Sequence, residues 1–85
     1  MTEVQVEALR EHLMELRGEA RLYWMSGASP RMNPDVRAVH RDVARHLAGT
    51  ANALHAALTA LGITGLGPTV ELETNTVQEA ESRTP

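Results

Sequence analysis

The N-terminal part of the chain carries apolar residues at alternating spacings of three and four, which places them on one face of a helix. This seam consists of Val6, Leu9, Leu13, Leu16, Ala20 and Tyr23. Thr2 and Gln5 have the spacing of a capping box, so the helix should begin just after Thr2. Gly27 and Pro30 are typical of a helix end. The pattern therefore predicts a helix over residues 3–25 with a coiled-coil-like apolar seam.

A second helix is predicted over residues 34–61. Asn33 is suited to an N-cap and Pro34 to the first helical position, while Gly62 should end the helix. The apolar seam again alternates spacings of four and three, and further apolar residues flank it. The seam is Val36, His40, Val43, Leu47, Thr50, Leu54, Ala57 and Leu61, flanked by Val39, Ala51 and Leu58.

Two long helices joined by a short loop favour an all-α fold, an antiparallel two-helix hairpin over residues 1–62. Placing the turn near Ser29 makes the second helix outrun the first, so its last turns are expected to lack a partner within the chain. Residues 63–85 are predicted to be an extended arm and polar tail, because residues 69–74 alternate polar and apolar positions and the rest is polar.

The far end of the second helix is apolar or small on nearly every face. Residues 46–70 contain no Asp, Glu, Lys or Arg, yet histidines, glycines and Pro68 make this stretch a poor membrane span. A helix apolar all round is normally buried, and a hairpin covers only one face. The alternative is an Ala-rich helix tolerated for its high propensity. We expect a protein interface formed by Leu47, Ala51, Leu54, Leu58, Leu61, Ile63, Leu66, Val70 and Leu72.

The composition supports assembly with other chains. A chain of 85 residues buries a small share of its surface, and it has no cysteine for disulfides and only Tyr23 and Trp24 as large aromatics. Oligomerisation, with a second copy or within a larger host assembly, is the favoured source of stability. The N-terminus does not have the pattern of a signal peptide, and we expect a cytoplasmic protein or one within a virion or similar assembly, without membrane association.

Arg37, Arg41 and Arg45 repeat on one face of the second helix and are possible nucleic-acid contacts. No lysine and no nearby aromatic accompanies them in the sequence, and the net charge is -3. Ion pairs with carboxylates of the first helix, within one chain or between subunits, are the simpler interpretation. Nucleic acid is therefore a possible partner but not the favoured one.

The remaining polar patterns predict no catalytic residue, metal or cofactor. The first helix has a ridge of carboxylates at a spacing of four, and no glutamate is followed three residues later by the histidine that di-iron bundles use. His40, His46 and His55 lack the spacing of a helical zinc site. The ridge consists of Glu3, Glu7, Glu11, Glu15 and Glu19 and is interpreted as a solvated face.

Two long helices around Trp24-Met25-Ser26-Gly27 resemble the small secreted helical hairpins of type VII secretion, which carry Trp-x-Gly in their turn. Here two residues separate Trp24 from Gly27, and the Tyr-x-x-x-Asp/Glu signal of that family is missing. We predict a non-enzymatic structural or adaptor protein of a larger complex such as a phage particle. The alternatives are a small helical regulator that binds nucleic acid, and one subunit of a secreted hairpin heterodimer.

Overall fold

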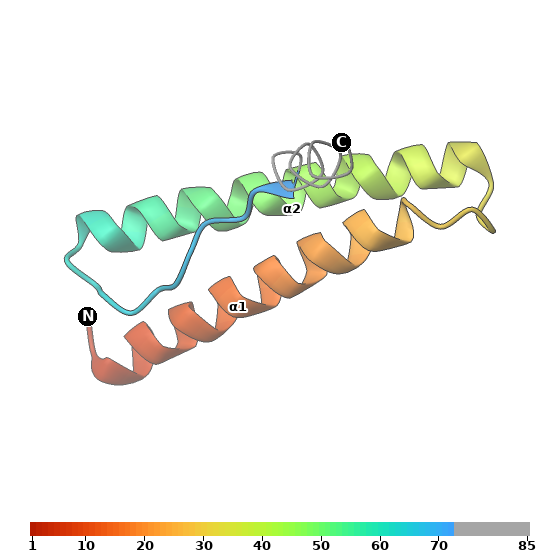
Figure 1. Ribbon diagram of the computed structural model, residues 1–85. Helices are drawn as coiled ribbons and strands as arrows, with labels where there is room; N and C mark the ends of the chain where they lie inside the picture. Colours follow the sequence, from red (N-terminus) through yellow and green to blue (C-terminus); the bar gives the residue numbers. More distant parts are fainter. Residues whose placement is uncertain (73–85) are drawn as a thin grey trace, which may run out of the picture.

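The computed structural model describes residues 1–72 of the chain and confirms the predicted all-α hairpin. Helix α1 spans Glu3–Ser26 and helix α2 spans Pro34–Ala60. The two helices run antiparallel and are joined by a loop over residues 27–33 (Figure 1). Within the described range there is no strand, so residues 69–72 do not form the strand that their alternating pattern suggested. The remainder of that pattern, residues 73–74, lies outside the described residues.

Local capping explains why the helix starts were predictable. The hydroxyl of Thr2 accepts a hydrogen bond from the backbone N–H of Gln5 at 3.2 Å, and the backbone N–H of Thr2 donates to Oε1 of Gln5 at 2.9 Å. At the second start, Oδ1 of Asn33 accepts from the backbone N–H of Asp35 at 2.8 Å, with Pro34 in the first turn. These bonds satisfy backbone donors that a helix start otherwise leaves unpaired.

The helices meet through leucines of α1 and alanines of α2. The buried residues of this contact are Leu13, Leu16 and Ala20 from α1 and Ala48, Ala51 and Leu58 from α2. The seam predicted for α1 is thus confirmed in its central part. The seam predicted for α2 is wrong in its position, because Thr50 and Ala57 are exposed and Leu61 is 64% exposed. Ala48 and Ala51 are buried in this contact, so the alanine face of α2 turns inward in place of part of the leucine face.

After α2 the chain turns back as an arm over residues 62–72. Figure 1 shows this arm running from the open end of the hairpin back along both helices. Leu66 and Val70 of the arm are buried in the same core as Leu13 and Leu58. The expectation that the last turns of α2 lack an intrachain partner is therefore wrong, since the arm covers them and leaves Leu58 only 2% exposed.

Buried and exposed alanines of α2 should differ strongly in how much their replacement by leucine lowers stability. Ala51 is 0% exposed, and Ala51→Leu adds three carbons where no space exists. We expect a loss of about 1–3 kcal/mol or more in the free energy of unfolding, measured by urea denaturation. The matched control is Ala53→Leu, which lies on the exposed side of the same helix and should change stability little. Equal effects of the two substitutions would contradict the packing described.

Candidate functional site

Asn52 fixes the arm through two hydrogen bonds to one residue. Its Oδ1 accepts from the backbone N–H of Val70 at 2.8 Å, and its Nδ2 donates to the backbone carbonyl of Val70 at 3.0 Å. The amide therefore takes the place of a neighbouring strand. Because Val70 is buried, leaving its backbone groups unpaired would be costly, and Asn52 avoids that cost.

Three further side chains hold the earlier part of the arm. Arg10 donates from Nη2 to the carbonyl of Thr64 at 2.8 Å, and Arg17 donates from Nη1 to the carbonyl of Leu66. Nε2 of His55 lies 3.1 Å from the carbonyl oxygen of Gly67, the geometry of a bond that its N–H donates. The arm is thus bound by side chains from both helices, none of which the sequence analysis had assigned to this role.

Arg17 is an unusual member of this set because it is buried. The residue is only 8% exposed, and its Nε and Nη2 make no hydrogen bond within the described residues. Loss of solvent, followed by the nearby charge of Arg21, lowers the pKa of Arg17 from its ordinary value. The docked arm therefore buries a guanidinium with N–H donors that lack acceptors. The free-energy cost of that burial offsets part of the stabilisation gained by burying Leu66.

The structure places most of the predicted interface residues around the core of the chain itself. Ala51, Leu58, Leu66 and Val70 are buried there. Four others are partly buried against the same core, namely Leu47, Leu54, Ile63 and Leu72. Leu61 is exposed. A contact of any of these residues with another chain stays a prediction, and only the residues that are still accessible are available for it.

Leu47, Leu54 and Leu61 share one side of α2, since they are spaced by seven residues. A helix turns by about 100° per residue. These leucines therefore lie along one edge of the face that α2 turns toward α1, whereas Asn52 and His55 lie toward the other edge. On α1, the same rotation per residue places Leu9 and Leu16 on a different side of the helix from Arg10 and Arg17, which bind the arm. The arm thus fills one groove between the helices. The opposite side of the hairpin carries the buried Leu16 and the partly or largely exposed Leu9, Leu47, Leu54 and Leu61, and this side is here called the leucine groove.

Two of the three candidate arginines meet an aromatic ring. The guanidinium carbon of Arg41 lies 3.7 Å from the centre of the Trp24 ring, and that of Arg45 lies 5.4 Å from it. Arg45 also forms an ion pair with Asp42 at 3.2 Å. Arg37 is not part of this cluster. Because Trp24 comes from α1, no local sequence signal could have paired it with arginines of α2.

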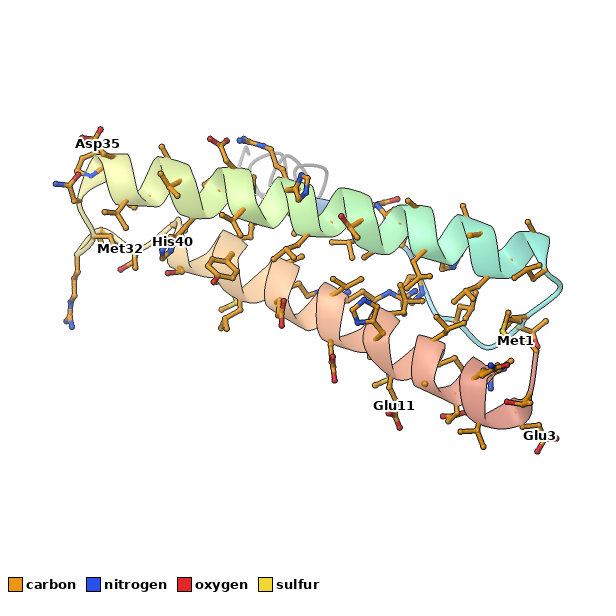
Figure 2. All side chains as sticks on the ribbon, turned by 180° about the vertical axis from the view of Figure 1, so that it is seen from behind. Met1, Glu3, Glu11, Met32, Asp35 and His40 are labelled. Carbon is orange, nitrogen blue, oxygen red and sulfur yellow. The ribbon has the colours of Figure 1, made fainter. Side chains whose placement is uncertain are left out.

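The expected ion pairs between the helices are not formed by the described residues. The arginine–carboxylate ion pairs within residues 1–72, Arg10–Glu7 and Arg45–Asp42, each join residues three apart on one helix. Figure 2 shows Glu3 and Glu11 pointing away from α2, as expected for a solvated carboxylate ridge. Arg41 instead gains a cation–π contact, which has a favourable energy of about 0.5–2 kcal/mol depending on exposure.

A cavity of about 680 Å³ adjoins the Trp24 cluster. It lies between the C-terminal part of α1, the first half of α2 and the end of the arm. We call it the arginine groove. Its lining residues are Arg21, Trp24, Met25, Ala28, Arg41, Pro68, Thr69, Val70, Glu71 and Leu72.

His40 links the end of α1 to the start of α2. Its Nδ1 lies 2.8 Å from the hydroxyl of Ser26, and its ring packs edge to face on Tyr23 with centroids 5.3 Å apart. No carboxylate in the described range joins this pair, so the acid of a hydrolase triad is not found there. Within residues 1–72 no group of three acidic, His or Cys side chains has the arrangement of a metal site.

None of the helices in the described range is both long and apolar enough for a membrane crossing. No protein-family model matches the chain, and no curated protein or solved structure is significantly similar to it. The two sides of the hairpin and the residues that line them are therefore the features from which a function is proposed.

The double hydrogen bond of Asn52 predicts a measurable role in stability. Asn52→Ala should lower the free energy of unfolding by about 1–3 kcal/mol, because it leaves the backbone N–H and carbonyl of Val70 without hydrogen-bond partners. Chemical denaturation monitored by circular dichroism provides the measurement. Thr50→Ala is the control, since its hydroxyl bonds only to the carbonyl of His46 in the same helix. A neutral Asn52→Ala would contradict the anchoring of the arm.

Gly27 permits the close packing of Arg41. A Cβ at Gly27 would lie 2.7 Å from Cγ of Arg41, whereas the φ of -66° suits any residue. We therefore expect Gly27→Ala to displace the Arg41 side chain from Trp24 and to change the fluorescence of this single tryptophan. Gly18→Ala is the matched control, because no atom lies within 4 Å of its new Cβ. An unchanged spectrum in Gly27→Ala would argue against the observed stacking.

Proposed function

We propose that this protein is a non-enzymatic structural or adaptor subunit that assembles by packing the leucine groove against a second copy of itself. The observation that carries the proposal is the unequal covering of the hairpin. The arm fills one groove between α1 and α2, while Leu47, Leu54 and Leu61 on the other side are left partly or largely accessible. Two hairpins joined through this side would form a four-helix arrangement.

The leucine spacing suits a twofold contact between two copies of α2. Leu54 lies midway between Leu47 and Leu61, so antiparallel packing of α2 on its copy places Leu47 of each chain opposite Leu61 of the other. A twofold interface requires a surface that is complementary to itself, and this one is symmetric about Leu54.

The charge distribution also favours a second copy as the partner. Residues 46–70 contain no Asp, Glu, Lys or Arg, so this half of α2 can be buried without enclosing an ionised carboxylate or guanidinium. Figure 2 shows Glu3 and Glu11 of the acidic ridge pointing away from α2. These two carboxylates of each copy are therefore kept out of the proposed contact.

Assembly would also meet the stability requirement of a chain of this size. A small domain buries a small share of its surface, and association adds buried apolar area without a larger fold. The proposal includes repeated use of such pairs in a larger complex, such as a phage particle, where the subunit would have a structural role.

Substituting the most exposed leucine of the groove tests this proposal. Light scattering on the full chain should give twice the mass of one chain, and Leu61→Gln should shift the mass toward that of a monomer at equal concentration. Leu22→Gln is the matched control, because Leu22 is 67% exposed, close to the 64% of Leu61, but lies on the outer side of α1. A monomeric wild-type protein, or equal responses of the two variants, would contradict dimerisation through the leucine groove.

A further inference from the structure

We propose that the arginine groove binds an extended segment of a partner protein in which acidic and apolar residues alternate. This inference rests on the proposed adaptor function and names the chemistry of its partner. It concerns the arm side of the hairpin, and the dimer contact concerns the opposite side.

Arg41 is held in a position suited to a carboxylate. The guanidinium carbon of Arg41 lies 3.7 Å from the centre of the Trp24 ring, and the stem of the side chain packs against Gly27, where even a Cβ would be too close. A guanidinium carries five N–H donors, and no ion pair within residues 1–72 uses those of Arg41. Those groups match the two oxygens of a carboxylate, and the fixed orientation lowers the entropy lost on binding.

A second arginine makes the groove cationic. Arg21 lies one turn before Trp24 on α1 and lines the same cavity. Within residues 1–72, neither Arg21 nor Arg41 forms an ion pair. Glu71 is the only acidic residue of the lining, so the groove has an excess of one positive charge. An acidic side chain of a partner would complement this excess.

The end of the arm offers backbone groups to an extended segment. Asn52 occupies both the N–H and the carbonyl of Val70. Where the backbone is extended, successive residues direct these groups to opposite sides, so we infer that those of Thr69 and Glu71 are directed away from Asn52. Both residues are exposed, and their backbone groups form no hydrogen bond within the described range. A peptide can pair with such an edge as an added strand.

The apolar part of the lining defines the other residues of the ligand. Met25 is exposed at the groove, and Val70 and Leu72 of the arm line it as well. Side chains of an extended peptide alternate between two directions, so an acidic residue directed at the arginines has apolar neighbours available for Met25 and Leu72. The preferred segment therefore alternates acidic and aliphatic residues.

A peptide fits these features better than a nucleic acid does. Glu71 lies in the lining and would repel successive phosphates, and the whole chain has a net charge of -3. Arg41 covers a face of the Trp24 ring on which a base would otherwise stack. A single carboxylate between Arg21 and Arg41 avoids both conflicts.

The single tryptophan provides a direct test with the full chain. A capped peptide of alternating Glu and Val is titrated while Trp24 fluorescence is recorded, and the same peptide with Lys in place of Glu is the matched ligand. We expect a saturable change with the Glu peptide, at least about tenfold weaker binding of the Lys peptide, and weakening by raised salt.

Variants locate the binding. Arg21→Gln should weaken binding of the Glu peptide by about tenfold, which corresponds to about 1.4 kcal/mol. Arg31→Gln removes the same charge outside the lining of the groove and should leave the affinity unchanged. Arg41→Gln should weaken binding too, but because Arg41 also packs on Trp24, the exposed Arg21 is the decisive position if Arg41→Gln does not fold.

Several outcomes would overturn the inference. These are equal binding of the two peptides, an Arg21→Gln variant that binds as tightly as the wild type, or a response confined to a single-stranded oligonucleotide or to inorganic phosphate. The test is separable from that of dimerisation, because Leu61→Gln should leave peptide binding intact. A dimer that does not bind the Glu peptide contradicts only the peptide site, and a monomer that binds it contradicts only the leucine contact.

Discussion

Extended backbone that packs against helices must have its N–H and carbonyl groups satisfied without a neighbouring strand. The arm of this protein meets that constraint with side chains from both helices: Arg10, Arg17, Asn52 and His55. Asn52 supplies a donor and an acceptor together, which is why Val70 can be buried. The anchored arm in turn completes the core, decides which groove of the hairpin is filled and forms one wall of the arginine groove.

The small residues of α2 set the geometry on which this arrangement depends. Ala48 and Ala51 occupy the contact between the helices, so the bulky leucines of α2 cannot all lie in it. Leu58 faces inward beneath the arm, whereas Leu47, Leu54 and Leu61 project to the other side. The alanine contact and the leucine groove are therefore two results of one orientation of α2, and the accessible leucines follow from the packing of the hairpin itself.

Features encoded by neighbouring residues were predictable, and those formed by distant residues were not. The capping of Thr2 and the Asn33-Pro34 pair are local, so the predicted helices, 3–25 and 34–61, end within one residue of the observed Glu3–Ser26 and Pro34–Ala60. Hydrophobic periodicity gave α1 its inner face but misplaced that of α2, since it weighs leucine above alanine and takes no account of close helix approach. The bonds from Arg10 to Thr64 and from Arg17 to Leu66 span 54 and 49 residues, and no pattern in the sequence indicated them. The stacking of Arg41 on Trp24 joins two helices and was missed for the same reason.

The return of the arm depends on Gly62, Gly65 and Gly67, whose φ angles of 82°, 73° and 73° other L-residues rarely adopt. Leucine, isoleucine and methionine can replace one another in a helical core, so an apolar pattern diverges quickly. The backbone path of the arm tolerates far less exchange. Distant relatives can therefore be sought by a signature of two parts. The first is an asparagine such as Asn52, 18 residues before the residue that its amide binds, here Val70. The second is three glycines at the spacing of Gly62, Gly65 and Gly67 between them.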